Sequence, residues 1–96
     1  MAEAEVEVRN PSGLHARPAA TFVRAAGGFG AEITLTNLTR DAERSASAKS
    51  VLGVMGLGVA TGHRIRISAV GDDADQAVSH LVELVASGLG EALDAP

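Results

Sequence analysis

The chain has 96 residues, a formal net charge of −4 from 8 basic and 12 acidic side chains, and no cysteine. The negative charge argues against a nucleic-acid partner, because Lys and Arg supply much of the affinity for a phosphate backbone. Without cysteine, disulfides and cysteine-ligated metals are excluded. The acidic N-terminus has no apolar signal core, and no run is long enough to span a membrane, so we expect one cytoplasmic domain over 1–96.

The first half of the chain predicts a strand, a helix and two further strands. Val6 and Val8 alternate with charged residues, which favours a half-buried strand. Phe22 and Ala26 recur at helical spacing, and a glycine-rich turn follows them. The next alternating segment is a second half-buried strand with Thr36 on its outer face. The expected ranges are 4–9, 31–36 and 42–47 for the strands and 16–26 for the helix.

The second half predicts a short helix, a strand and a longer helix. Three glycines within 49–58 weaken helix formation, so at most a short helix fits there. Asp72 and Asp73 are expected to cap the last helix, and the tail over 90–96 is expected to fray. The strand is expected over 63–70, and the apolar stripe of the last helix comprises Val78, Leu81, Val82, Val85 and Leu89.

The predicted order is therefore strand, helix, strand, strand, short helix, strand, helix. Strands that alternate polar and apolar residues usually have one solvated face. We therefore expect an α+β fold in which helices cover only one side of an antiparallel sheet.

A histidine stands where the first predicted helix begins. Pro18 has no amide proton and suits only the first turn of a helix, which places His15 at or near its N-cap. The free amides of Ala16 and Arg17 then form an anion site beside the imidazole. The neutral form of the ring has a nitrogen lone pair that can attack phosphorus. The Arg17 guanidinium can hold phosphate oxygens through charge-assisted hydrogen bonds.

Position alone leaves a second interpretation open. His15 is then an ordinary polar residue at a helix start, and Arg17 is a solvated side chain of the first turn. His63 and His80 are expected at the surface, because no cluster of histidines or carboxylates has the spacing of metal ligands.

Two sequence motifs carry a family resemblance. The run 13–20, Gly-Leu-His-Ala-Arg-Pro-Ala-Ala, resembles the active-site signature of HPr, the histidine-containing phosphocarrier family of the bacterial phosphotransferase system. Glu43-Arg44 and the run 49–58 resemble the second signature of that family, around its regulatory serine. The resemblance covers essentially the whole chain and implies an open-faced sandwich, with a four-stranded antiparallel sheet covered by helices on one side.

The resemblance also implies a function. His15 would receive a phosphoryl group on Nδ1 from Enzyme I and pass it to an enzyme IIA-type domain during phosphoenolpyruvate-dependent sugar uptake. Arg17 would stabilise the phosphate, and no metal or organic cofactor is required. Such a protein is a stoichiometric carrier and not an enzyme, and a monomer is the simplest expectation.

Five further residues are candidates for regulation or docking. Ser50 precedes an apolar run, so its structural role is to cap the short helix. The resemblance instead makes Ser50 a target of HPr kinase, whose added charge would repel partners. Leu52 and Met55 are expected to belong to a partner-docking patch, together with Ala20 and Arg24. Arg24 lies two turns beyond Arg17 on the first predicted helix and would also widen the positive charge around Arg17.

Other functions remain open at this point. The phosphoryl acceptor could serve a nitrogen-related branch or a dihydroxyacetone kinase in place of sugar uptake. A regulatory binding module with the same fold would not relay phosphate at all. A nucleic-acid-binding domain is disfavoured by charge, and a self-sufficient enzyme is disfavoured because no second catalytic group accompanies His15 and Arg17.

Overall fold

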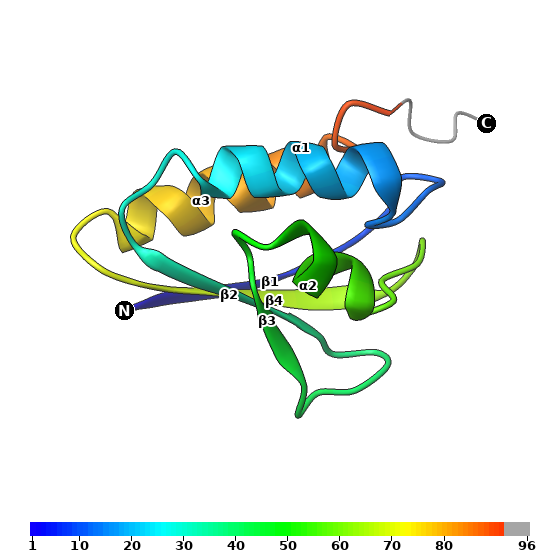
Figure 1. Cartoon of the computed structure of the whole chain (residues 1–96), viewed down its shortest axis with the longest axis horizontal. Helices are drawn as coiled ribbons and strands as arrows, with labels where there is room; N and C mark the ends of the chain where they lie inside the picture. Colours follow the sequence, from blue (N-terminus) through cyan, green and yellow to red (C-terminus); the bar gives the residue numbers. More distant parts are fainter. Residues whose placement is uncertain (92–96) are drawn as a thin grey trace.

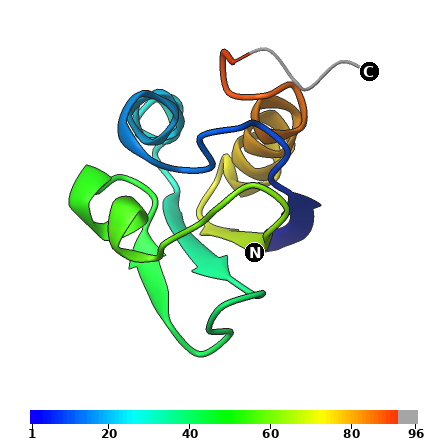
Figure 2. The same cartoon turned by 90° about the vertical axis from the view of Figure 1, so that its right-hand side faces the viewer.

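Four strands form one antiparallel sheet in the order β1-β4-β2-β3. The computed structural model describes residues 1–91 of the chain. Helices α1 and α3 lie over one face of the sheet, and α2 lies on the same side next to α1 and β3 (Figures 1 and 2). The strands are β1 (Ala2–Glu7), β2 (Glu32–Asn37), β3 (Ser45–Ser47) and β4 (Arg64–Val70), and the helices are α1 (Ala16–Ala26), α2 (Val51–Gly56) and α3 (Ala74–Ala86). The predicted α+β open-faced sandwich is therefore confirmed.

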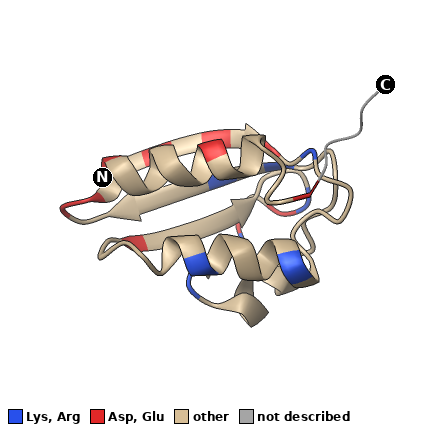
Figure 3. Cartoon of the chain, turned by 90° about the horizontal axis from the view of Figure 1, so that it is seen from above, with Lys and Arg blue, Asp and Glu red and all other residues tan. Residues whose placement is uncertain are grey.

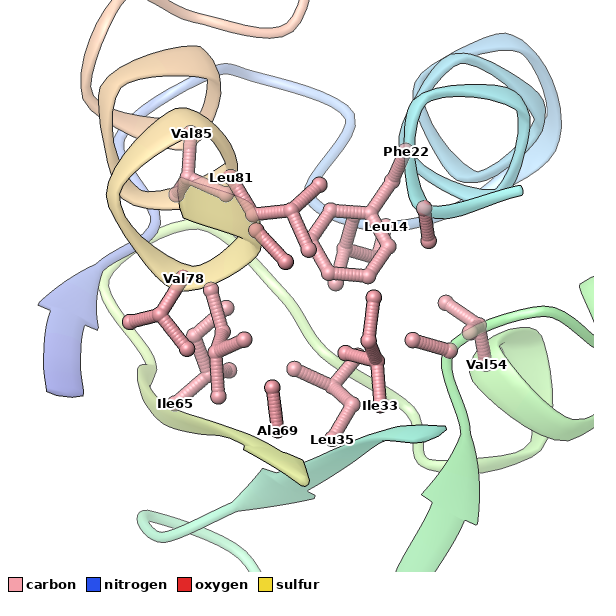
Figure 4. Close-up of a cluster of buried hydrophobic side chains, with 14 of the residues drawn as sticks. Leu14, Phe22, Ile33, Leu35, Val54, Ile65, Ala69, Val78, Leu81 and Val85 are labelled. Carbon is pink, nitrogen blue, oxygen red and sulfur yellow. The ribbon is translucent and has the colours of Figure 1, made fainter. Parts of the chain in front are cut away.

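The core between sheet and helices is mainly aliphatic, and Phe22 is the one aromatic side chain fully buried within residues 1–91 (Figure 4). Side chains from the inner face of the sheet point toward those of α1 and α3 in this view. Burial of each such side chain contributes about 1.5–3 kcal/mol. The largest buried apolar side chains are Phe22, Leu14, Leu35, Ile65, Ile67, Leu81 and Leu89.

Helix α1 has the predicted bounds, but α3 is shorter than its apolar stripe suggested. It ends at Ala86, so Leu89 lies beyond the helix. Gly88 and Leu89 both have positive φ, 98° and 55°, which stops the helix. Leu89 is nevertheless buried, because the chain turns back against the core.

Strand boundaries and one burial prediction differ from the sequence analysis. β1 covers 2–7 in place of 4–9, and β3 covers only three residues because a turn at Asp41 continues to Arg44, whose amide donates to the Asp41 carbonyl. Thr36 was expected to be solvated but is only 4% exposed. Its hydroxyl lies 2.8 Å from the Ser45 hydroxyl on the neighbouring strand, which covers it.

The predicted cap of the last helix is partly wrong. Asp73 is the N-cap residue of α3, but its side chain makes no hydrogen bond to that helix. Its carboxylate accepts hydrogen bonds from the amides of Gly30 and Ala31, at 2.8 and 2.9 Å, in the loop that enters β2. The Gly30 bond, followed by the Ala31 bond, lowers the pKa of the Asp73 carboxyl below its ordinary value. Asp73 therefore links two loops that are distant in sequence.

None of the helices within residues 1–91 is both long and apolar enough to cross a membrane.

Candidate functional site

His15 is exposed at the N-cap of α1, as the sequence predicted. Its backbone is extended, with φ −114° and ψ 152°, and its side chain makes no capping hydrogen bond. The preceding residue, Leu14, is fully buried, and its amide donates a 3.0 Å hydrogen bond to the Val59 carbonyl. The exposed His15 therefore directly follows, in the chain, a residue that is buried and hydrogen-bonded through its backbone.

The turn before the histidine requires glycine at position 13. Gly13 has φ 57°, and an added Cβ would collide with the Val59 carbonyl oxygen and lie 2.8 Å from Ala60 Cα. Two hydrogen bonds close the turn: the Gly13 amide donates to the Asn10 carbonyl at 3.1 Å, and Asn10 Nδ2 donates to the Gly13 carbonyl at 2.8 Å. Asn10 is fully buried, so its side-chain hydrogen bond to Gly13 anchors the turn to the interior of the protein.

The first turn of α1 leaves its leading amides free. A helix has no internal acceptor for these N–H groups, and no acceptor for the amides of Ala16 and Arg17 is found within residues 1–91. Ala16 has φ 48°, a left-handed conformation that costs an ordinary residue about 1–2 kcal/mol. Pro18 is the third residue of the helix, where its missing N–H does no harm. The structure therefore brings His15 and the two predicted amides to one helix end.

Arg17 lines a groove of about 340 Å³ at this end of α1. The groove is bounded on its other side by the chain that follows α3, including Glu91. The positive charge of Arg17 is among the causes that lower the pKa of the Glu91 carboxyl. The groove residues are Ser12, Ala16, Arg17, Pro18, Thr21, Leu89, Gly90 and Glu91.

Glu91 is a site residue that the sequence analysis missed. Its carboxylate accepts hydrogen bonds from Asn10 Nδ2 at 2.9 Å, the Ser12 amide at 3.1 Å and the Ser12 hydroxyl at 2.8 Å. The Asn10 bond, followed by the two Ser12 bonds, lowers the pKa of this carboxyl. Glu91 belongs to the tail over 90–96 that was expected to fray, and residues 92–96 of that tail lie outside the described residues.

The regulatory candidate has the structural role predicted for it. Ser50 is the N-cap of α2, and its hydroxyl accepts a 3.0 Å hydrogen bond from the Gly53 amide. The residue is exposed. A modifying group attached to this oxygen would lie at the N-terminus of α2.

The four docking candidates lie on the adjacent helices α1 and α2 (Figure 2). Leu52 is 84% exposed and is the most exposed large apolar side chain of α2. Met55 and Ala20 are half-buried, and Arg24 is exposed. The Lys, Arg, Asp and Glu residues of α1 are all basic, whereas those of α3 are all acidic (Figure 3).

No group of three or more His, Asp or Glu side chains within residues 1–91 is arranged to hold a metal ion. The groups present at the start of α1 are the His15 imidazole, the Arg17 guanidinium and the amides of Ala16 and Arg17.

Comparison with known proteins agrees with this geometry. Residues 2–87 match the family model "PTS HPr component phosphorylation site". A phosphocarrier protein HPr from Vibrio cholerae is 46% identical over 85 residues, which is 88% of this chain and 95% of that protein. A solved structure, HPr-C-His from Thermoanaerobacter tengcongensis, shares 42% identity with a TM-score of 0.88, covering 97% of this chain and 100% of the other.

Longer relatives contain a similar segment. A multiphosphoryl transfer protein from Haemophilus influenzae is 48% identical over 88 residues, or 92% of this chain, and the match spans only 17% of that protein. The family match over residues 2–87 includes the exposed histidine at the start of α1 and all four strands. The sequence match, the fold and the position of this histidine agree, and the chain belongs to the HPr family of phosphocarriers of the phosphotransferase system.

Proposed function

We propose that this chain takes a phosphoryl group onto His15 from phosphorylated Enzyme I and hands it to an enzyme IIA-type domain. The observation that carries the proposal is the exposed imidazole at the N-cap of α1, next to Arg17 and two amides without acceptors. The transfer serves phosphoenolpyruvate-dependent sugar uptake in this proposal, and it takes place in the cytoplasm.

The chemistry is a displacement at phosphorus. The lone pair of His15 Nδ1 forms a nitrogen–phosphorus bond while the bond between phosphorus and the donor breaks, and the donor keeps that electron pair. The Arg17 guanidinium and the amides of Ala16 and Arg17 hold the phosphoryl oxygens, as Arg and helix N-termini do in other phosphate sites. Transfer to the acceptor restores His15, so the chain is a stoichiometric carrier and not an enzyme.

Partner binding is assigned to the surface formed by α1 and α2. The exposed Leu52 supplies apolar area, and Met55 can adapt its shape to more than one partner. Ala20 and Arg24 extend this surface along α1 toward the loop before β2. One surface that receives both donor and acceptor would have to bind them in turn, which suits a monomer that shuttles between them.

Ser50 is the proposed regulatory site, with HPr kinase as its modifying enzyme. Its exposure supports access by the kinase. A phosphate there would gain the helix N-terminus of α2 as a partner while adding negative charge beside Leu52. Such charge would weaken binding of an acidic partner surface.

A direct experiment tests the relay. The protein is incubated with phosphoenolpyruvate, magnesium and Enzyme I, and its mass is followed until one phosphoryl group has been gained. A panel of enzyme IIA-type domains, including those of nitrogen-related and dihydroxyacetone kinase branches, is then added. We expect loss of the group to an acceptor of the sugar branch. A group that is never gained contradicts the proposal, and one gained but never released favours a regulatory binding module.

A further inference from the structure

His63 lies in the loop between α2 and β4, and its ring is engaged in a hydrogen-bond network. The residue was expected at the surface, but it is only partly exposed. Its Nδ1 lies 3.1 Å from the Ala60 backbone nitrogen and 3.1 Å from Asn37 Nδ2 at the end of β2. Two nitrogen donors therefore converge on one ring nitrogen.

The orientation of the Asn37 amide indicates which nitrogen of the His63 ring carries the proton. Asn37 Oδ1 accepts from the Arg40 amide at 3.3 Å, and Nδ2 donates to the Leu57 carbonyl at 3.2 Å. Exchanging the oxygen and nitrogen of this amide would place Oδ1 against the Leu57 carbonyl oxygen and Nδ2 against the Arg40 N–H. Only the observed orientation gives both side-chain atoms a hydrogen-bond partner. The second Nδ2 hydrogen is then available to His63. Because both neighbours of Nδ1 are donors, Nδ1 is the acceptor and the ring proton is on Nε2.

The Ala60 amide is joined to the phosphoacceptor segment through a single peptide group. Its N–H belongs to the same rigid plane as the Val59 carbonyl. That carbonyl accepts the 3.0 Å hydrogen bond from Leu14, the residue before His15. The same carbonyl lies against Gly13, which leaves no room for a Cβ. The Val59–Ala60 peptide group therefore donates its N–H to the His63 ring and accepts the Leu14 amide hydrogen at its oxygen.

We propose that His63, as the Nε2-protonated neutral ring, is a positioning residue for His15. This inference rests on the proposed phosphocarrier function. A ring that loses its acceptor at Nδ1 frees the Val59–Ala60 peptide plane to rotate, and the Val59 carbonyl then turns away from the Leu14 amide. The backbone that carries His15 is no longer fixed, so the imidazole meets the donor phosphorus in the wrong orientation more often. His63 itself touches neither the phosphoryl group nor a partner.

Three variants separate this role from ordinary packing. His63→Asn places a carbonyl oxygen where Nδ1 stood, the same number of bonds from Cα, and so keeps the acceptor. His63→Leu removes the acceptor while retaining a side chain of similar bulk. His80→Leu, at an exposed histidine of α3, is the matched control. Each variant is compared with the unaltered chain by hydrogen exchange of the Leu14 amide and by the initial rate of phosphorylation by Enzyme I.

We expect His63→Leu to raise exchange of the Leu14 amide about tenfold relative to core amides of β4, and to slow phosphorylation about tenfold. His63→Asn should restore both to within about twofold of the unaltered chain, and His80→Leu should change neither. In the unaltered protein, nitrogen chemical shifts of His63 should show the lone pair on Nδ1 and the proton on Nε2.

Several outcomes would overturn the proposal: a proton on Nδ1, unchanged Leu14 exchange in His63→Leu, or a His63→Asn variant as impaired as His63→Leu. If His63→Leu does not fold, the nitrogen chemical shifts of the His63 ring and the behaviour of His63→Asn still test the proposal. Failure of the unaltered chain to accept phosphate would instead contradict the proposed function. The exchange of the Leu14 amide and the ring chemical shifts do not depend on phosphorylation, so they would still test the role of His63.

Discussion

At the residue scale, the proposed site consists of one imidazole, one guanidinium and two backbone amides at the start of α1. Arg17 and Glu91 line the same groove beside this helix end. Glu91 is itself held by Asn10 and Ser12, so it offers Arg17 a fixed negative neighbour. The guanidinium therefore has a carboxylate nearby in the free protein and, in our proposal, a phosphoryl group after transfer.

Replacing Arg17 tests how the phosphoryl group is held. Lys keeps the positive charge but loses the planar fork of donors, and Gln loses both. We expect phosphorylation by Enzyme I to slow about tenfold in Arg17→Lys and about a hundredfold in Arg17→Gln. Because Arg17 is exposed, the free energy of unfolding should change by less than about 0.5 kcal/mol in either variant. Unaltered rates in both variants would remove Arg17 from the mechanism.

Gly13→Ala tests the close approach beneath the histidine. Both the positive φ and the contact with Val59 oppose a side chain, so we expect a loss of about 3 kcal/mol in the free energy of unfolding. Gly62→Ala is the matched control, since Gly62 has φ 89° and nothing within 4 Å of an added Cβ. That variant should lose only about 1 kcal/mol. Equal losses in urea unfolding would show that the contact contributes nothing.

At the element scale, features with local causes were predictable and those with distant causes were not. The bounds of α1 follow from helical spacing closed by glycines, and Ser50 caps α2 as an N-cap serine should. Glu91 could not be predicted, because its partner Ser12 is 79 positions away. Asp73 likewise has the residue type of a cap, yet its carboxylate bonds to a loop 42–43 positions earlier.

Ser50 provides a test of α2. Removing its hydroxyl in Ser50→Ala leaves the Gly53 amide without its acceptor, so we expect a loss of about 1 kcal/mol in the free energy of unfolding. Ser50→Asp keeps an acceptor at the helix start and should retain most of that stability. Ser79→Ala, on the exposed side of α3, should change stability by less than about 0.5 kcal/mol. A Ser50→Ala variant as stable as this control would show that the cap is unimportant.

At the scale of the whole molecule, two carboxylates connect segments that are distant in sequence. Asp73 links the start of α3 to the loop that enters β2, and Glu91 links the chain after α3 to the turn before α1. These contacts join both ends of α3 to the loops at both ends of α1. The position of the helix that carries His15 therefore depends on groups at both ends of its neighbour.

The two carboxylates predict how stability depends on pH. Their pKa values in the folded protein lie below the ordinary values of 3.8 for Asp73 and 4.5 for Glu91. Their contribution is therefore complete above those ordinary values and is lost as pH falls through the lowered ones. We expect the urea midpoint to fall between about pH 5 and about pH 2, and to fall less steeply in Asp73→Asn and Glu91→Gln. The same dependence on pH in both variants would contradict these assignments.

The measurement that tests the central claim most directly is the location of the transferred group. After reaction with phosphoenolpyruvate, magnesium and Enzyme I, the protein is kept alkaline and fragmented in a mass spectrometer, alongside His15→Ala and the control His80→Ala. We predict one acid-labile phosphoryl group on His15, its complete absence from His15→Ala, and normal incorporation in His80→Ala. A group that remains in His15→Ala, or that is found on another side chain, would contradict the account.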